Sequence, residues 1–299
     1  MTIGVALALP ACSQGVTEDP EGLRVAAGFF PIAEAAEIVG GPRVHVENLT
    51  PPGSDPHDVE LTPDEVDLIL DADLLLYLGG GFQSGVEELA ERRDGASLDL
   101  LEGVETIEGT DEHEGEEEGH EGEEVDPHIW LDMLRYARLV ERVGEALVEV
   151  DAEGAEAYRE RAGAHTEEIR ALDERFAGRL AACERDLLVV SHAAFGYLAD
   201  RYGLHQEAIT GISPESEPDP QRLAELTDLV RSEGVTTVFT ETLVSPDVAE
   251  TLAREAGVET AVLNPLEGLT EEEDAAGETY LSVMESNLET IAEALGCPG

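Results

Sequence analysis

Residues 62–92 decide the fold, and they read TPDEVDLILDADLLLYLGGGFQSGVEELAER. The start of this stretch, TPDE at 62–65, carries the capping signals of a helix N-terminus. Residues 74–78 form a continuous apolar run of the kind found in buried parallel strands, and three glycines then lead into a second helix over 84–92. Helix, buried strand and helix in succession predict parallel βαβ units and therefore an α/β fold.

The same alternation extends along both halves of the chain. In the first half, strands are expected over 25–29 and 44–49, with a helix over 31–39 between them. In the second half, strands are expected over 187–190, 236–240 and 260–263, with helices over 193–202, 220–232 (capped by Asp219), 246–256 and 277–295. The pattern therefore predicts two similar lobes, each a parallel sheet flanked by helices.

Between the two halves, residues 152–182 contain no proline and place apolar side chains at steps of three and four. At 1.5 Å per residue, this predicts a helix about 45 Å long, which could run along both lobes as a rigid spine. We therefore expect a short N-terminal segment (1–22), an N-terminal lobe (23–150), a linker helix (151–183) and a C-terminal lobe (184–299).

The chain of 299 residues is strongly acidic, with 68 Asp and Glu against 17 Arg, no Lys, and a formal net charge of −51. Nucleic acid is excluded as a partner because phosphate binding depends on clustered basic side chains. No stretch of 18 apolar residues is free of charges or turn residues, so no membrane span is expected. The charge favours cations as ligands, although adaptation to a salty environment would explain it equally well.

The cysteines point to an oxidising compartment. The sequence LPAC at 9–12 follows an apolar run and is typical of the end of a bacterial lipoprotein signal, in which Cys12 is lipidated; the basic start of such a signal is missing, and an ordinary thiol is the alternative. The other two cysteines, Cys183 and Cys297, are then expected to form a disulfide across 114 residues, with two unpaired thiols as the alternative.

Three histidines follow predicted strands or turns in separate parts of the chain: His57, His128 and His192. Ligands of α/β sheets bind in the crevice beyond the carboxyl ends of the strands, so these side chains could converge there. His45, His165 and His205 are interpreted as structural residues.

Five motifs carry a family resemblance that covers nearly the whole chain. They are PGSDPHD (52–58), DPHIWLD (126–132), SHAAFGYL (191–198), GISPESEP (211–218) and LNPLEGLT (263–270). In order and spacing, the chain resembles the zinc/manganese substrate-binding lipoproteins of metal ABC importers (cluster A-I, zinc type). The resemblance implies an extracytoplasmic receptor, monomeric and not an enzyme, that binds a metal between two lobes and delivers it to a membrane permease.

The resemblance also implies the metal ligands. His57, His128 and His192 match family ligands, and the fourth ligand falls on Glu267, because Asn264 stands where other relatives carry an Asp and cannot supply a charge. Glu241 is the reserve for this position. Three imidazoles and one carboxylate favour Zn²⁺, with Mn²⁺ as the alternative.

Residues 108–125 hold ten acids, four glycines and two histidines, His113 and His120, and are expected to form a disordered surface loop. This loop could gather zinc near the cleft, or it could be a solvated run of charge.

Two other functions of the protein stay open. One is a zinc hydrolase with Glu267 or Glu241 as general base, and the other is an anchored adhesin that binds no stoichiometric metal.

Overall fold

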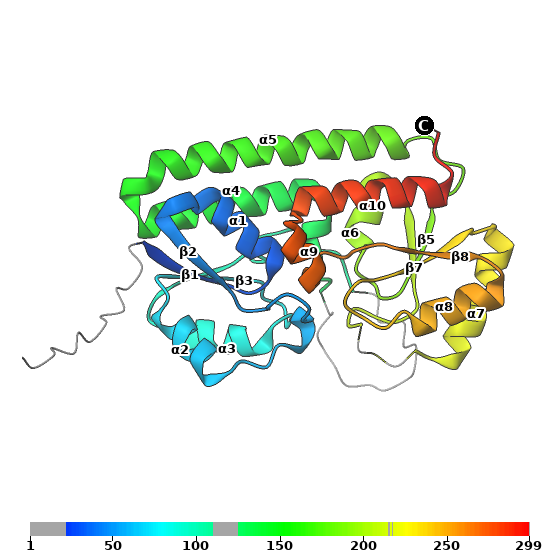
Figure 1. Ribbon diagram of the computed structural model, residues 1–299, viewed down its shortest axis with the longest axis horizontal. Coiled ribbons are helices and arrows are strands. Elements are labelled where there is room, and N and C mark those ends of the chain that lie inside the picture. Colours follow the sequence, from blue (N-terminus) through cyan, green and yellow to red (C-terminus); the bar gives the residue numbers. More distant parts are fainter. Residues whose placement is uncertain (1–21, 110–124, 215, 217, 299) are drawn as a thin grey trace, which may run out of the picture.

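The computed structural model describes residues 22–109, 125–214, 216 and 218–298. Within these residues the strands form two parallel sheets, one in each lobe (Figure 1). The first sheet has the order β2-β1-β3-β4, with β1 (Leu23–Ala27), β2 (Val44–Asn48), β3 (Leu74–Tyr77) and β4 (Ala96–Asp99). The second has the order β6-β5-β7-β8, with β5 (Leu187–Val190), β6 (His205–Ala208), β7 (Thr237–Thr240) and β8 (Glu259–Val262). The prediction of two similar α/β lobes is confirmed.

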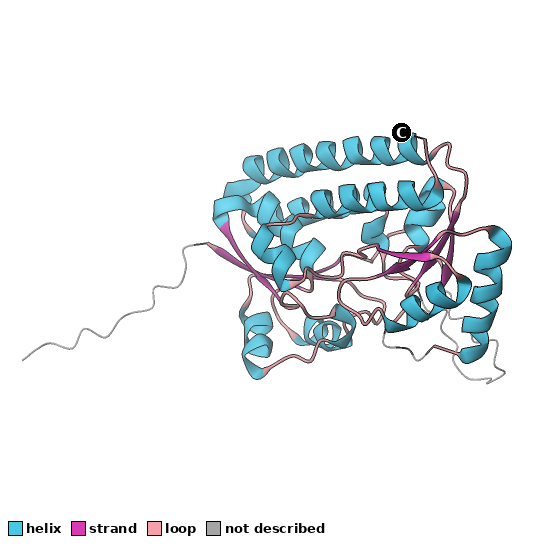
Figure 2. Ribbon diagram, turned by 45° about the vertical axis from the view of Figure 1, so that its right-hand side comes forward, coloured by secondary structure: helices cyan, strands magenta, loops and turns pink. Residues whose placement is uncertain are grey.

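The helices separate into those that flank one sheet and a layer of long helices along one side of the molecule. Flanking the N-terminal sheet are α1 (Phe30–Gly40), α2 (Pro63–Asp71) and α3 (Ser84–Arg92), and flanking the C-terminal sheet are α6 (Gly196–Tyr202), α7 (Pro220–Glu233) and α8 (Asp247–Ala256). A layer of long helices lies along one side of the molecule, made of α4 (Met133–Val150), α5 (Ala155–Leu180) and α10 (Tyr280–Leu295) (Figures 1 and 2). The short α9 (Glu271–Ala276) precedes α10.

Local signals account for the helix starts. Thr62 caps α2 in a capping box with Glu65, and the side chain of Asp219 accepts a hydrogen bond from the backbone N of Gln221 at the start of α7. Both starts were predicted from the sequence.

Several details differ from the sequence prediction. The helix expected over 193–202 begins only at Gly196, and the strand expected over 25–29 is Leu23–Ala27. The long helix does not begin at Ala152, because residues 152–154 form a 3₁₀ turn, and α5 starts at Ala155. The predicted helix over 277–295 begins only at Tyr280, because Gly277 takes a left-handed conformation that ends α9 and Thr279 then caps α10. The edge strands β4 and β6 were not predicted, since neither contains an apolar run: β4 has two polar residues among four, and β6 has three.

One buried apolar cluster extends through both lobes. It includes Val25 of β1 and Leu188 of β5, and it continues through side chains of α4, α5 and α10. On α5, the buried residues Tyr158, Ile169 and Phe176 repeat at helical spacing, as predicted for the spine. The two lobes are therefore packed on a common helical layer, and this layer holds the two sheets in a defined relative position.

The disulfide between Cys183 and Cys297 is present and confirms the predicted pairing. It joins the chain just after α5 to the chain just after α10. The two long bridging helices are thus covalently tied at one end (Figure 1). None of the helices in the described residues combines the length and apolar character that a membrane span requires.

Glu34 gives a testable link between the N-terminal lobe and α10. Its carboxylate is buried and accepts hydrogen bonds from the backbone N of Tyr280, the first residue of α10. Burial raises the pKa of Glu34 from 4.5 to about 7, against the opposing effect of the Tyr280 hydrogen bond. Between these two pH values the folded chain holds a proton that the unfolded chain has lost, so the free energy of unfolding falls as the pH rises through this window.

We therefore expect the parent chain to lose about 3 kcal/mol of stability relative to Glu34→Gln between pH 5 and pH 8. Urea unfolding of the metal-free chain at both pH values measures this difference. Glu47→Gln, at an exposed position of β2, removes an equal charge and serves as the control. A parent-to-E34Q difference that does not change with pH would contradict the prediction.

Candidate metal centre

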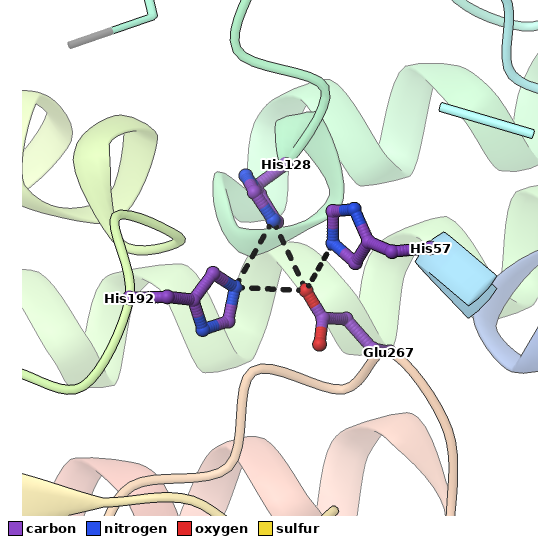
Figure 3. Close-up of side chains that lie close together, drawn as sticks. All are labelled: His57, His128, His192 and Glu267. Atoms are coloured by element: carbon purple, nitrogen blue, oxygen red, sulfur yellow. Dashed lines mark hydrogen bonds and ion pairs between the residues drawn. The ribbon is translucent and has the colours of Figure 1, made fainter. Parts of the chain in front are cut away.

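Four side chains from four separate segments meet between the two lobes (Figure 3). His57 lies in the 3₁₀ turn Pro56–Asp58 that follows β2, and His128 directly precedes the turn Ile129–Leu131. His192 follows β5 by two residues, and Glu267 lies in the loop after β8. The structure thus brings together the three histidines and the glutamate that the resemblance implied.

The contacts converge on one carboxylate oxygen. Glu267 Oε1 lies 3.0 Å from His57 Nε2, 3.1 Å from His128 Nε2 and 2.9 Å from His192 Nε2. The Nε2 atoms of His128 and His192 are 3.3 Å apart, and the four ligand atoms of the group all lie within 4.8 Å of one another. Three imidazole nitrogens and one carboxylate oxygen at this separation form a donor set suited to a tetrahedral zinc ion.

The group is shielded from solvent. His128 and His192 are fully buried, and Glu267 is 1% exposed. His57 packs edge-on against Phe82, with ring centroids 4.8 Å apart, and the Phe82 ring in turn lies 5.6 Å from that of Trp130. This apolar wall lowers the local dielectric, which strengthens the attraction between the carboxylate and a bound cation.

Two carboxylates set the orientation of the buried imidazoles. Asp126 Oδ1 lies 2.7 Å from His128 Nδ1, and Glu241 Oε2 lies 2.7 Å from His192 Nδ1. Each carboxylate also accepts the backbone N–H of its histidine. A carboxylate at Nδ1 holds the proton there and leaves the Nε2 lone pair directed at the metal.

These contacts change the interpretation of two acidic residues. Glu241 lies behind His192, where its oxygens bond that histidine, and it is not a member of the group of four. Asp126 was not predicted from the sequence, although it belongs to the DPH motif. A carboxylate two residues before a candidate ligand histidine was the signal for this role.

The charges of the group are strongly coupled. Burial lowers the pKa of His192, but the negative charges of Glu241 and Glu267 outweigh burial and raise that pKa well above its usual value. Burial also lowers the pKa of His128, but Asp126 and Glu267 outweigh burial and raise that pKa above its usual value. For Glu267, burial alone would raise the pKa, yet the charge of His192 and the hydrogen bonds from the imidazoles hold it well below its usual value. The site therefore keeps an ionised carboxylate, and protons compete with any cation for the imidazoles.

The remaining candidates lie elsewhere. Asn264 is buried in the loop before Glu267, and its side chain bonds the backbone of Leu266 and the carboxylate of Glu273. His45 and His205 are exposed, and His165 is buried on α5 beside Glu168. Cys12, His113 and His120 fall outside the described residues.

The fold and the site have known counterparts. The family model of zinc-uptake complex component A, described as periplasmic and abbreviated ZnuA, matches residues 25–294. The chain belongs to this family. The resemblance first seen in five short motifs is thereby confirmed over almost the whole chain.

Individual relatives of this ZnuA-family chain are named as zinc-binding or zinc-uptake proteins. The zinc-binding lipoprotein AdcA of Streptococcus pneumoniae is 39% identical over 297 residues, covering 96% of this chain and 58% of that protein. The high-affinity zinc uptake system protein ZnuA of Bacillus subtilis is 32% identical over 303 residues, covering 97% of this chain and 94% of that protein. The chain thus spans a little over half the length of the AdcA relatives and nearly all of the Bacillus protein.

A solved structure of a relative has a similar fold. The zinc-bound ZnuA-like domain of Streptococcus pneumoniae AdcA matches with a TM-score of 0.78 and 35% identity, covering 92% of this chain and 99% of that domain. The two-lobed arrangement is therefore shared with a zinc-bound member of the family.

Proposed function

We propose that this chain is an extracytoplasmic zinc receptor that captures Zn²⁺ and delivers it to an ABC permease. His57, His128, His192 and Glu267 are the proposed ligands. The single observation that carries the proposal is the convergence of three Nε2 atoms and one carboxylate oxygen within 4.8 Å. Membership of the ZnuA family supports delivery to a permease as the next step.

Zinc is proposed over manganese because the donor set is rich in nitrogen. Neutral imidazoles suit zinc, manganese favours oxygen ligands, and the general affinity order of divalent metals also places zinc above manganese. The deciding experiment is metal analysis of the purified chain followed by competition between Zn²⁺ and Mn²⁺ at equal free concentration. One tightly bound zinc per chain is expected, and a preference for manganese would overturn the metal assignment.

A zinc hydrolase with Glu267 as general base is disfavoured by the geometry. Catalytic zinc needs a coordination position open to water. Glu267 Oε1 lies within 3.1 Å of all three Nε2 atoms, which supports this carboxylate as the fourth ligand. The carboxylate of Glu241 contacts His192 Nδ1, on the side of the ring away from the group of four. We therefore propose binding and release, without turnover of ester, peptide or phosphate substrates.

The proposal also covers the location of the protein, the boundaries of its two lobes and the acidic segment 108–125. We propose that Cys12 carries a lipid that anchors a monomeric receptor outside the cytoplasmic membrane, and relatives named as lipoproteins support this. We also propose that residues 23–150 and 184–299 form the two lobes, joined by 151–183. His113 and His120 are proposed to gather zinc weakly, so deleting residues 108–125 is expected to leave the tight site intact.

Glu241 gives a prediction about the orientation of His192. In Glu241→Gln, the amide presents a donor where the carboxylate accepts the Nδ1 proton, which favours the tautomer with its proton on Nε2. That tautomer cannot bind a metal through Nε2, so we expect zinc affinity to fall by about 10- to 100-fold. Loss of the Glu241 charge also lowers the pKa of His192, so proton competition is expected to set in at a lower pH.

Zinc titrations of the Glu241→Gln variant from pH 5 to 8 measure both effects. Glu250→Gln, exposed on α8, removes an equal charge away from the site and is the matched control. If E241Q and E250Q bind zinc equally well, Glu241 does not orient His192.

A further inference from the structure

The loop that carries Glu267 has an unusual backbone. Leu266, directly before Glu267, has φ of 58°, and it is the one non-glycine residue with a positive φ in the part of the chain that the structure describes. Its side chain is fully buried. A non-glycine residue in the left-handed region is uncommon, and it persists only where the surroundings determine the conformation.

Hydrogen bonds from three directions hold this loop. The side-chain oxygen of Asn264 accepts the backbone N–H of Leu266 at 2.8 Å. On α10, Asn287 Oδ1 accepts from the Asn264 backbone N at 3.0 Å, and Asn287 Nδ2 donates to the Asn264 carbonyl at 2.7 Å. From the N-terminal lobe, Trp130 Nε1 donates to the carbonyl of Pro265 at 2.8 Å. The backbone on the N-terminal side of Glu267 is therefore fixed by both α10 and the opposite lobe.

The Asn264 side chain also has a defined polarity. Its Nδ2 donates to Glu273 Oε1 at 3.1 Å, while Glu273 Oε2 accepts from the backbone N of Thr270 at 2.8 Å, as part of the capping box of α9. Position 264 thus needs an acceptor facing Leu266 and a donor facing Glu273. An asparagine amide meets both demands, whereas an aspartate would place two carboxylates against each other.

We propose that Asn264, Asn287 and Glu273 are positioning residues that aim the Glu267 carboxylate at the metal and thereby set both zinc affinity and the preference for zinc over manganese. This inference rests on the zinc receptor function proposed above. A ligand must be held close to its productive geometry by its supporting residues. A carboxylate fixed for a four-coordinate ion disfavours a metal that prefers more oxygen ligands, and a loosened carboxylate relaxes that preference.

A polarity swap tests the proposal. Asn264→Asp removes the donor that faces Glu273, and Glu273→Gln turns a donor toward Asn264 while its oxygen still accepts from Thr270. In the double variant N264D/E273Q, the glutamine donates to the aspartate, so the bond between positions 264 and 273 is restored with its direction reversed, and the bonds accepted from Leu266 and Thr270 are kept. We expect each single change to lower zinc affinity by about 10- to 100-fold and to narrow the zinc-to-manganese affinity ratio, and the double variant to recover both to within about threefold.

A second pair of variants separates positioning from stability. Asn287→Leu removes both bonds to Asn264, whereas Leu288→Ala damages the buried face of the same helix without removing a hydrogen bond from the loop. Unfolding measurements of the metal-free variants show how far each lowers stability. We expect N287L alone to change the zinc-to-manganese ratio and the visible spectrum of a Co²⁺-loaded site, which reports ligand geometry.

The outcomes distinguish this inference from the proposed function. If the parent chain binds no zinc, both fall. If the parent binds one zinc tightly, and the folded single variants bind zinc and manganese as the parent does, the inference is overturned while the receptor function stands. Failure of the double variant to recover, or an equal change in the metal ratio for L288A and N287L, also overturns it.

Discussion

Replacing His192 with alanine is expected to lower zinc affinity by roughly 100- to 1000-fold. The binding free energy of a structural four-ligand zinc site is about 10–16 kcal/mol, so one ligand accounts for about 3–4 kcal/mol, and each 1.4 kcal/mol is a factor of ten. The substitution also removes the imidazole that links Glu267 to Glu241, leaving two buried carboxylates without their shared partner. The same reasoning applies to His128→Ala, which separates Asp126 from Glu267.

Zinc titration against a competing chelator measures this loss at neutral pH. His205→Ala is the matched control, because His205 is exposed at the start of β6 and lies outside the group of four. We expect H205A to bind zinc as the parent does. Tight stoichiometric zinc binding by folded H192A and H128A would refute the ligand assignment.

Removing the disulfide is expected to have the largest effect on stability. The chain-entropy model gives about 4–5 kcal/mol for a loop of this length, because the bridge restricts the unfolded chain across 114 residues. A formal net charge of −51 adds to this effect, since mutual repulsion expands the unfolded chain and makes closure of the loop less probable. The double variant Cys183→Ser/Cys297→Ser is therefore expected to lose more stability at low salt than at high salt.

Urea unfolding of the metal-free parent and double variant, at low and high salt, checks both statements. Zinc affinity under native conditions is the internal control. Neither cysteine belongs to the ligand group, so the affinity should stay close to that of the parent. A loss of less than about 1 kcal/mol at both salt concentrations would contradict the entropic account.

Much of the fold could be predicted because its signals are local. The apolar run over 74–78 and the capped start at Thr62 identify β3 and α2 from neighbouring residues alone. Strand β6 was not predicted because it lacks such local signals. Its residues, His205–Ala208, have no strong strand pattern, and they become a strand because β5 offers them an edge to pair with.

The metal centre, too, could be predicted only in part from the sequence. Histidines placed after predicted strands or turns indicated His57, His128 and His192, and the short motifs around them are enough to identify the family. For the fourth position, the resemblance implied Glu267, with Glu241 as the reserve, because Asn264 cannot supply a charge. In the folded chain, Glu267 faces the three imidazoles, Glu241 supports His192, and Asn264 holds the loop.

By itself, then, the sequence determined the α/β class, the two lobes and the three candidate histidines, because periodicity and motifs are carried by residues close together in the chain. The pairing of Cys183 with Cys297, 114 residues apart, was one of two alternatives until the folded chain brought them together. The tertiary structure showed that Glu267, and not the reserve Glu241, lies with the histidines, and only the tertiary structure revealed that Asp126 and Glu241 support them. His57 and Glu267 are 210 residues apart, and their 3.0 Å contact exists only because the two sheets are packed on a common helical layer. The relative position of the two sheets depends on the packing of the whole core, and no local pattern in the chain encodes it.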